Sequence, residues 1–390
     1  MRIIYKFLLL AFSILLVFSC VKEVKKIKAK LPNTAVYFPL PKKVRAPSNN
    51  PMSQEKIDLG KLLFYDPILS GNKDVACVTC HHPDFGYAEF RDLSIGVNGV
   101  GLSGRRRFKS PNDIPIVKRN ANTVLNTAHN GMQHNGSYDP EDAPMFWDSR
   151  ENSLEAQALA PLKALEEMKG ADFSEEEILD TLVNRLKNIP EYVTLFEAAF
   201  PAEEAVTSDN IAKSIASFER TLASGNSRFD QFLAGDSEAL SLGEKDGFEL
   251  FKSAGCNNCH SGPMFSDFKM HVLGVPDNEK LEVSDDGFEK TYGFRTPSLR
   301  NLRYTAPYMH NGKLKELKDV LEFYEDISSG ISKNPHVPNE KIDSLARKIK
   351  IKVKDMGSII SFFNSLNDVD FDKEIPERVP SNLPVGGNIQ

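Results

Sequence analysis

Two short stretches decide the fold: Cys77-Val78-Thr79-Cys80-His81 and Cys256-Asn257-Asn258-Cys259-His260. Each stretch places two thiols three positions apart, with a histidine directly after the second thiol. Two thiols at this spacing can form thioethers to the vinyl groups of one haem, and the imidazole that follows can bind the iron. Both stretches therefore predict covalently attached haem c, with His81 and His260 as iron ligands.

Two other kinds of site use the same residue types. A zinc site built from two CxxC pairs is usually compact, whereas these pairs lie 176 residues apart. Disulfides also form between CxxC cysteines in an oxidising compartment. Neither alternative explains why a histidine follows each pair, so haem attachment is the preferred interpretation.

The N-terminus has the pattern of an export signal. Arg2 and Lys6 precede the apolar run 7–18, which is too short to span a bilayer comfortably. The run ends in Val-Phe-Ser-Cys, which resembles a lipobox, although its phenylalanine is larger than that pattern prefers. We expect residues 1–20 to be a lipoprotein-type signal peptide and Cys20 to be lipidated, which would anchor the protein to a membrane on the periplasmic or outer face of the envelope. The alternative is an ordinary signal peptide and a soluble periplasmic protein.

The formal net charge is −6, but the charges are unevenly distributed along the chain. Residues 1–45 carry nine more basic than acidic side chains, so residues 46–390 carry −15. This gives no general reason to expect a nucleic-acid partner. An acidic body would instead attract a basic soluble protein, such as a small electron carrier. Residues 21–50 mix Lys and Pro without periodicity, so we expect a flexible tether there.

Apolar residues recur at helical spacing over much of the remaining chain, often after a capping residue. The segments with this pattern are 53–64, 174–186, 211–222 and 317–324. The stretches 92–140 and 262–300 are instead rich in Gly, Asn, Asp and Pro, and we expect long loops there, which in a compact protein usually serve function or surround a cofactor.

A weak internal repeat precedes the two cysteine motifs. Gly60, Leu63 and Phe64 come before the first, and Gly247, Leu250 and Phe251 come before the second at the same mutual spacing. A chain of this length usually forms more than one domain. We predict a mainly α fold of two cytochrome c-like haem domains with long loops, an N-terminal domain over 51–237 and a C-terminal domain over 238–390.

Three further segments carry a resemblance to a known family. They read Arg-Asn-Ala-Asn-Thr-Val-Leu-Asn at 119–126, Phe-Trp-Asp-Ser-Arg at 146–150, and Thr-Pro-Ser-Leu-Arg-Asn-Leu at 296–302 running into Thr-Ala-Pro-Tyr-Met-His-Asn-Gly at 305–312. Together with two CxxCH motifs, they resemble the bacterial di-haem cytochrome c peroxidase and MauG superfamily over residues 50–370. The resemblance implies an oxidoreductase that reacts with hydrogen peroxide at its N-terminal haem and passes electrons through its C-terminal haem.

The resemblance also implies which side chains serve that reaction. The family's inter-haem tryptophan falls on Trp147, and its distal-pocket residues fall on Gln157, Pro161 and Glu167. We expect Glu167 to be the acid and base, because a carboxylate in a partly desolvated pocket can take a proton from peroxide and return it. Without the family, Trp147 would be a core aromatic, and Glu166 and Glu167 would be a solvated helix face.

The sixth iron ligands decide which haem is open. Many peroxidases of the family close the N-terminal haem with a histidine at the position where this chain has Val97, so the resemblance implies an open site. The family's methionine ligand at the C-terminal haem is replaced by Tyr324, as in the MauG branch, and we expect Tyr324 to bind that iron. Without the family it would be a core aromatic. Met309, Met270 and His271 are the fallback ligands.

Three more histidines bear on this point. His82 follows His81 and is interpreted as a solvated side chain. His129 and His134 lie in the loop 127–144, which is longer than the family's connection. If either of them closed the first haem, the protein would be an electron-transfer cytochrome without catalysis.

A structural calcium ion commonly lies between the haems in this superfamily, held by one asparagine side chain and two backbone carbonyls. The matching positions are Asn120, Thr305 and Pro307. Without the family these residues would be ordinary turn and loop residues, which Asn and Pro also favour.

Two catalytic functions remain open. In the first, a cytochrome c, a cupredoxin or a quinol-linked donor supplies electrons and peroxide is removed. In the second, which is MauG-like, side chains of a protein partner are oxidised. The absence of a second tryptophan slightly weakens the second function. The resemblance also raises a homodimer as an alternative to a monomer.

Overall fold

The computed structural model describes residues 37–201 and 204–390. The signal peptide, the lipidation site at Cys20 and the first part of the tether lie outside these residues. Within them the protein is mostly helical. The helices are α2 (Gln54–Tyr65), α3 (Cys77–Cys80), α4 (Leu154–Lys163), α5 (Glu175–Lys187), α6 (Pro190–Ala199), α7 (Ser208–Thr221), α8 (Arg228–Leu233), α9 (Leu242–Ser253), α10 (Leu317–Ile327) and α11 (Met356–Ser365). The strands are β1 (Gly99–Val100), β2 (Arg107–Phe108), β3 (Met270–Val272) and β4 (Gly293–Arg295).

Helix α2 begins where the sequence predicts it, because the Ser53 side chain accepts a hydrogen bond from the Lys56 backbone N–H. Its apolar face, which includes Leu59 and Leu63, packs against α7. At the crossing, a Cβ atom on Gly60 would lie only 1.9 Å from the Ser214 carbonyl oxygen. The two helix backbones therefore touch at a position that only glycine allows.

The same contact occurs in the second half of the chain. Helix α9 packs against α11, and a Cβ atom on Gly247 would lie 2.0 Å from the Ser358 carbonyl oxygen. Gly60 and Gly247 are equivalent positions of the internal repeat seen in the sequence. The repeat therefore marks two helix crossings of the same kind, each just before a CxxCH motif.

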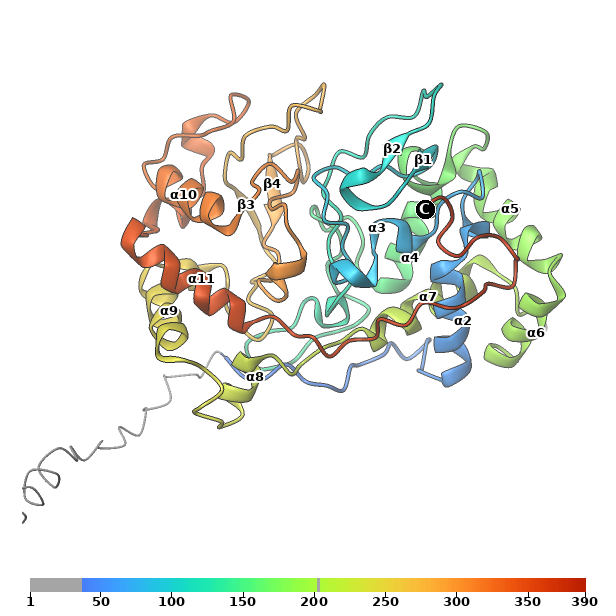
Figure 1. The fold of residues 1–390 in the computed structure, drawn as a ribbon, viewed down its shortest axis with the longest axis horizontal. Coiled ribbons are helices and arrows are strands. Elements are labelled where there is room, and N and C mark those ends of the chain that lie inside the picture. Colours follow the sequence, from blue (N-terminus) through green and yellow to red (C-terminus); the bar gives the residue numbers. More distant parts are fainter. Residues whose placement is uncertain (1–36, 202–203) are drawn as a thin grey trace, which may run out of the picture. The chain divides into compact units, whose positions relative to one another are not determined.

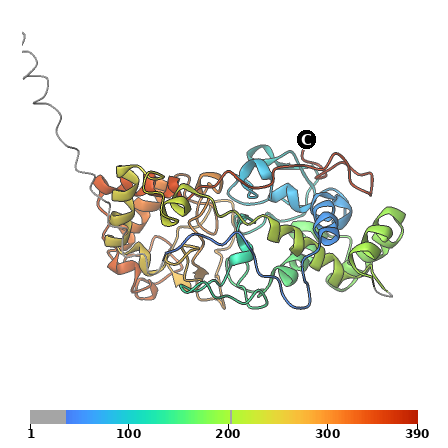
Figure 2. The same cartoon turned by 90° about the horizontal axis from the view of Figure 1, so that it is seen from below.

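The apolar side chains form two main clusters. One gathers residues of α2 and α4 to α7, and the other gathers residues of α8 to α11. Figures 1 and 2 both show these two groups of helices in separate halves of the folded body. Residues 222–227 connect α7 of the first group to α8 of the second.

Both ends of the described chain cross from one half to the other. After α11, the chain returns to the first half, where the Gly386 N–H donates to the Tyr65 carbonyl at 2.8 Å and the Ser381 hydroxyl donates to Asp66 at 2.7 Å. At the other end, Tyr37 is buried against Phe248.

This second crossing corrects part of the tether prediction. Leu40 is also buried, and its N–H donates to Asp230 at 3.0 Å. Residues 37–50 are thus part of the folded body. Their apolar side chains are spaced irregularly, so periodicity alone does not reveal this packing.

The long loops predicted at 92–140 and 262–300 are present. Among the described residues, they hold only short antiparallel pairs, β1 with β2 and β3 with β4, and single helical turns. No helix of the described residues is both long enough and apolar enough to cross a membrane.

The helix crossing can be tested with Gly60→Ala. The added methyl group would force α2 and α7 apart, and we expect a loss of about 2 kcal/mol in the free energy of unfolding, measured by chemical denaturation. Gly243→Ala in α9 is the matched control, because a Cβ atom there meets nothing within 4 Å. The control should be neutral or slightly stabilising, since alanine favours a helix over glycine. Equal stability of the two variants would contradict the close crossing.

Candidate functional site

One cavity of about 670 Å³ reaches both CxxCH motifs. Its walls come from α3, α4, α7, α10 and the long loops. Most residues for which a role at the haems or the calcium site was predicted line it: Cys77, Cys80, His81, Asn120, Trp147, Gln157, Pro161, Glu167, Cys256, Cys259, His260, Thr305, Pro307 and Tyr324. The fallback ligands His271 and Met309 also line it, whereas Met270 and Val97 are not among its lining residues.

The backbone orients His81. Its Nδ1 lies 3.2 Å from the Tyr87 carbonyl oxygen, which can only accept, so Nδ1 carries the hydrogen and Nε2 keeps a free lone pair. Burial lowers the pKa of His81, which favours the neutral ring that binds a metal. The short helix α3 presents both cysteines just before this ring.

His260 repeats this arrangement. Its Nδ1–H donates to the Phe265 carbonyl at 2.9 Å, and burial lowers its pKa as well. All four cysteines of the two motifs are free thiols on the wall of the same cavity. Two thiol pairs and two neutral imidazoles with a free Nε2 are the donor set that two haem c groups need, so the residues present fit them.

Glu167 lies in a single π-helical turn, Leu165–Lys169, that follows α4. The loop before β1 holds this turn, because the Val97 N–H donates to the Glu167 carbonyl at 3.0 Å. A Cβ atom on Gly96 would lie 2.1 Å from the same oxygen, so glycine is needed for this close approach. Burial raises the pKa of Glu167 to about 7. The carboxyl therefore exchanges its proton near neutral pH.

Gln157 and Pro161 lie one turn apart on α4 and share the cavity wall with Glu167. The resemblance assigned these three residues to one pocket, and the structure brings them together. The N-cap of α4 is Ser153, whose side chain accepts from the Ala156 N–H at 3.1 Å.

Trp147 is buried, and its indole N–H donates to the Asn120 carbonyl at 2.9 Å. The Asn120 N–H in turn donates to the His310 carbonyl at 2.7 Å. These bonds tie the tryptophan to a segment from each half of the chain. A tryptophan fixed in this way cannot turn without breaking the link.

Arg119 forms a second link beside Trp147. Its guanidinium contacts the Asp148 carboxylate at 2.6 Å and the Asp285 carboxylate at 2.5 Å. Both aspartates have a pKa held below the usual range by this arginine, against the effect of burial. The three charges therefore stay ionised and join residues from both halves.

Tyr324 lies on α10 and faces the second CxxCH motif in the cavity. Burial raises its pKa, and the thiols of Cys259 and Cys256 act in the same direction. The phenol is thus neutral in the protein alone, and a cationic partner such as ferric iron is needed to stabilise a phenolate there.

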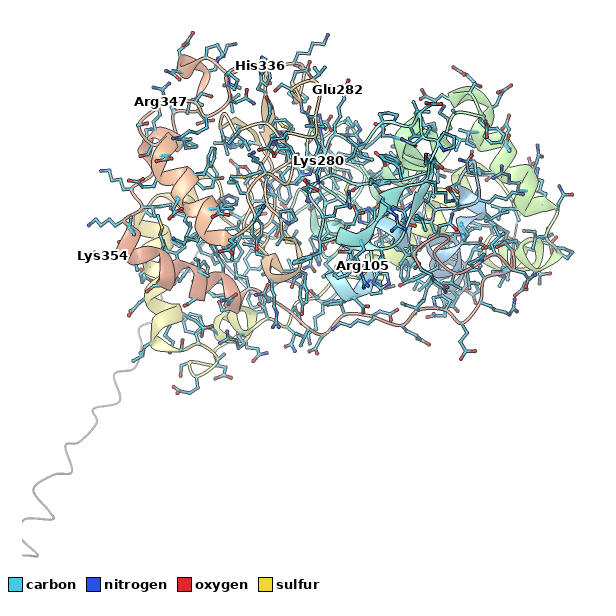
Figure 3. All side chains as sticks on the ribbon, turned by 45° about the horizontal axis from the view of Figure 1, so that its top comes forward. Arg105, Lys280, Glu282, His336, Arg347 and Lys354 are labelled. Atoms are coloured by element: carbon cyan, nitrogen blue, oxygen red, sulfur yellow. The ribbon has the colours of Figure 1, made fainter. Side chains whose placement is uncertain are left out.

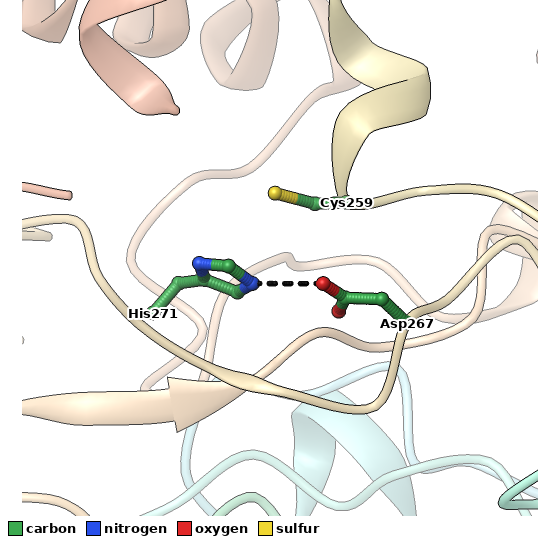
Figure 4. A group of neighbouring side chains, drawn as sticks. All are labelled: Cys259, Asp267 and His271. Carbon is green, nitrogen blue, oxygen red and sulfur yellow. Dashed lines mark hydrogen bonds and ion pairs between the residues drawn. The ribbon is translucent and has the colours of Figure 1, made fainter. Parts of the chain in front are cut away.

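His271, one of the fallback ligands, has both ring nitrogens engaged. Nδ1 lies 2.7 Å from Asp343 and Nε2 lies 3.1 Å from Asp267. Hydrogen bonding to Asp267 and to Cys259 raises its pKa to about 11. Cys259, Asp267 and His271 are close enough to hold a metal ion (Figure 4). Haem attachment through Cys259 would use the same thiol, which would leave His271 paired with Asp267 and Asp343.

The comparisons with known proteins agree with this geometry. Residues 54–238 match the family model described as di-haem cytochrome c peroxidase. The methylamine utilization protein MauG of Methylorubrum extorquens is 36% identical over 292 residues, which cover 74% of this chain and 73% of that protein. Cytochrome c551 peroxidase of Pseudomonas aeruginosa is 34% identical over 299 residues, 74% and 77% of the two chains. The chain belongs to the di-haem cytochrome c peroxidase family.

A solved structure, a MauG-like protein associated with microbial copper homeostasis, superimposes with a TM-score of 0.66 at 28% identity over 84% of this chain and 93% of that one. As a member of the di-haem cytochrome c peroxidase family, the protein is an oxidoreductase with two haem c groups. The relatives include both MauG and cytochrome c peroxidases, so membership leaves the choice between these two functions open.

Three more histidines of this family member were interpreted from the sequence, namely His82, His129 and His134. His82 is 5% exposed and its Nδ1 accepts from the Asp84 N–H, so it caps the turn Pro83–Phe85 and is buried, not solvated as expected. His134 lies 2.9 Å from the Ser261 hydroxyl, directly after the second motif. Neither His129 nor His134 is among the described residues that line the cavity. Neither can close the first haem in this arrangement.

Two buried carboxyls escaped the sequence analysis. Glu219 is 5% exposed, lines the cavity, and has an oxygen with no hydrogen-bond partner among the described residues. Glu89 is 1% exposed, and neither of its carboxyl oxygens has such a partner. Burial raises the pKa of Glu219 to about 8 and that of Glu89 to about 7. The sequence does contain an indication that Glu219 is buried, because it falls one turn after Ile215 on the apolar face of α7.

The raised pKa of Glu219 predicts how stability changes with pH. The folded protein keeps this proton at pH values where the unfolded chain has lost it, so the free energy of unfolding falls as pH rises from about 4.5 to about 8. Each unit of pKa difference is worth about 1.4 kcal/mol. In denaturation of the haem-loaded protein, Glu219→Gln should flatten this fall, whereas Glu197→Gln at an exposed position should not. The same slope in both variants would refute a buried protonated Glu219.

Proposed function

We propose that the protein reduces hydrogen peroxide at the haem attached through Cys77, Cys80 and His81. The observation that carries the proposal is Glu167, a carboxyl with a pKa near neutrality in the wall of the first haem site, held by the loop that has Val97 in place of an iron ligand. The overall reaction consumes one peroxide, two electrons and two protons and yields two waters.

Bound haem would supply an iron that binds peroxide and takes up the oxidising equivalents when the oxygen–oxygen bond breaks. The protein supplies the proton transfer. Glu167 accepts the proton of the inner oxygen and delivers it to the outer oxygen, which leaves as water. Gln157 offers a neutral amide to the same pocket and can hold peroxide in place, and Pro161 contributes an apolar wall without an N–H.

The first haem is proposed to be open without prior activation. Val97 is fully buried and apolar, and its N–H is bonded to the turn that carries Glu167. A side chain of this kind cannot bind iron, and its N–H ties the loop to the turn that carries Glu167. No ligand at this position would have to be displaced before peroxide binds.

Tyr324 is proposed to supply the second protein ligand of the iron that His260 would hold, which would close the second haem. A phenolate is an anionic oxygen donor and stabilises ferric and higher oxidation states more than methionine does. Trp147, fixed between segments of both halves, would carry electrons from this haem to the first. Calcium at Asn120, Thr305 and Pro307 would stabilise the same region, since carboxamide and carbonyl oxygens suit that ion.

The proposed architecture has two cytochrome c-like domains, 51–237 and 238–390, one for each haem. The two glycine crossings and the two apolar clusters support two domains. Phe229 and Phe232 of α8 pack in the second cluster, so the second core begins a few residues before the proposed boundary. Export and lipidation at Cys20 would place the enzyme on the periplasmic or outer face of a membrane. In that compartment the enzyme would be accessible to a soluble electron donor.

A MauG-like function is the second candidate, in which side chains of a protein partner supply the electrons. Tyr324 and Val97 favour it, because the MauG branch has this ligand pattern. A steady-state assay with peroxide and a reduced small cytochrome separates the two. We expect fast, saturable oxidation of the cytochrome, whereas sluggish turnover with long-lived oxidised haem would favour the MauG-like function.

Glu167 itself is tested by Glu167→Gln. The glutamine cannot take a proton, so we expect the second-order rate of reaction with peroxide to fall about a hundredfold or more while both haems stay attached. In the wild type this rate should rise with pH through about 7, because Glu167 must be ionised to act as the base, and this dependence should vanish in the variant. Stopped-flow absorbance of the haem band measures both.

Glu166→Gln is the matched control, since it changes the neighbouring carboxyl in the same turn. Its peroxide rate should stay within a few-fold of the wild type. If the two variants react equally fast, Glu167 is not the proton-transfer group.

A further inference from the structure

A basic segment, residues 341–354, stands out on an otherwise acidic protein. Six of its fourteen residues are cationic and one is acidic. All six cations are exposed, and none has a carboxylate of the described residues within 4.0 Å. They are Lys341, Arg347, Lys348, Lys350, Lys352 and Lys354.

The basic segment packs directly on the second haem motif. The Lys350 N–H donates to the Ala254 carbonyl at 2.9 Å, two residues before Cys256. Ala346 and Ile349 line the cavity at the second haem site. Apolar side chains of the segment thus form part of the haem wall, and the cations between them point to solvent. Figure 3 shows Arg347 and Lys354 projecting from the surface of this half.

The acidic groups nearby offset the segment only in part. Glu340 and Asp355 flank it, and with Asp343 they leave a net charge of +3 over residues 340–355. Three carboxylates on α9 and α10 have cations of their own. Glu249 on α9 pairs with Lys252 at 2.7 Å. On α10, Glu322 pairs with Lys318 at 3.3 Å, and Asp326 pairs with Lys333 at 2.8 Å. The six cations therefore leave a local positive field over the second haem site.

We propose that the basic segment is the docking surface for a small soluble electron-donor protein with an acidic face. This inference rests on the proposed function, in which electrons enter through the second haem. Each docked donor would give up one electron and leave oxidised, so two donors are consumed for each peroxide reduced to two waters with two protons from solvent. The whole protein is negative, but the basic segment is positive. At contact, charge complementarity therefore favours a donor with an acidic face.

The pattern of the segment favours a protein over a membrane as the partner. Ile349 and Ile351 turn inward, and Val353 is the one large hydrophobic residue of the described segment that is exposed. A surface of this kind offers charge without the apolar face that an interfacial helix inserts into lipid. Its position beside the second haem site, moreover, suits a partner that exchanges electrons.

The test is a binding titration with the haem-loaded full chain and no peroxide. The probes are an acidic c-type cytochrome and a basic one of similar size, each titrated by calorimetry at low and at high salt. We expect the acidic probe to bind, with an affinity that falls as salt increases. Lys350→Glu with Lys352→Glu should weaken this binding about tenfold or more.

Arg105→Glu with Arg107→Glu is the matched control, because both arginines are exposed on the other half and the net charge changes equally. This double substitution should reduce the affinity for the acidic probe less than twofold. Equal losses in the two variants, or binding of the basic probe alone, would overturn the proposal. Vesicles of anionic phospholipid form a third arm, and binding to them that requires Lys350 and Lys352, with no binding of the acidic probe, would also overturn it. Because no peroxide is present, these outcomes are independent of whether Glu167 serves peroxide reduction.

Discussion

The contact between helix backbones at two glycines is the constraint on which the rest of the structure depends. At Gly60 and at Gly247 a neighbouring helix lies so close that no side chain fits. The crossings bring Ile215 of α7 and Phe363 of α11 to the cavity wall, while α9 leads directly into the second cysteine motif. Two similar crossings therefore build two similar sites, whose walls meet in one cavity.

Between these two sites, hydrogen bonds and ion pairs connect the two halves of the chain. Trp147, Asn120 and Arg119 bond to segments from both halves, and the buried charges among them are paired. Such pairing is what makes buried charge tolerable. Glu167 and Glu219 are different, because burial raises their pKa values and neither forms an ion pair with another of the described residues. Carboxyls of this kind cost stability and are typical of sites that move protons.

Much of this was predictable from sequence because the signals are local. The CxxCH motifs, the capped helix after Ser53 and the glycine repeat each depend on a few neighbouring residues. Features that depend on distant residues were missed or wrong. Tyr37 packs against Phe248 and Leu40 bonds to Asp230, both far along the chain. His82 is buried and accepts from the Asp84 N–H. The π-helical turn under Glu167 depends on the loop at Gly96, which sequence periodicity does not show.

The central claim is an open first haem beside a second haem closed by Tyr324. Low-temperature electron paramagnetic resonance of the fully oxidised protein as purified tests it most directly, because spin state reports the number and strength of iron ligands. One high-spin and one low-spin ferric signal are predicted. Two low-spin signals would contradict the account, since another residue would then close the haem at His81.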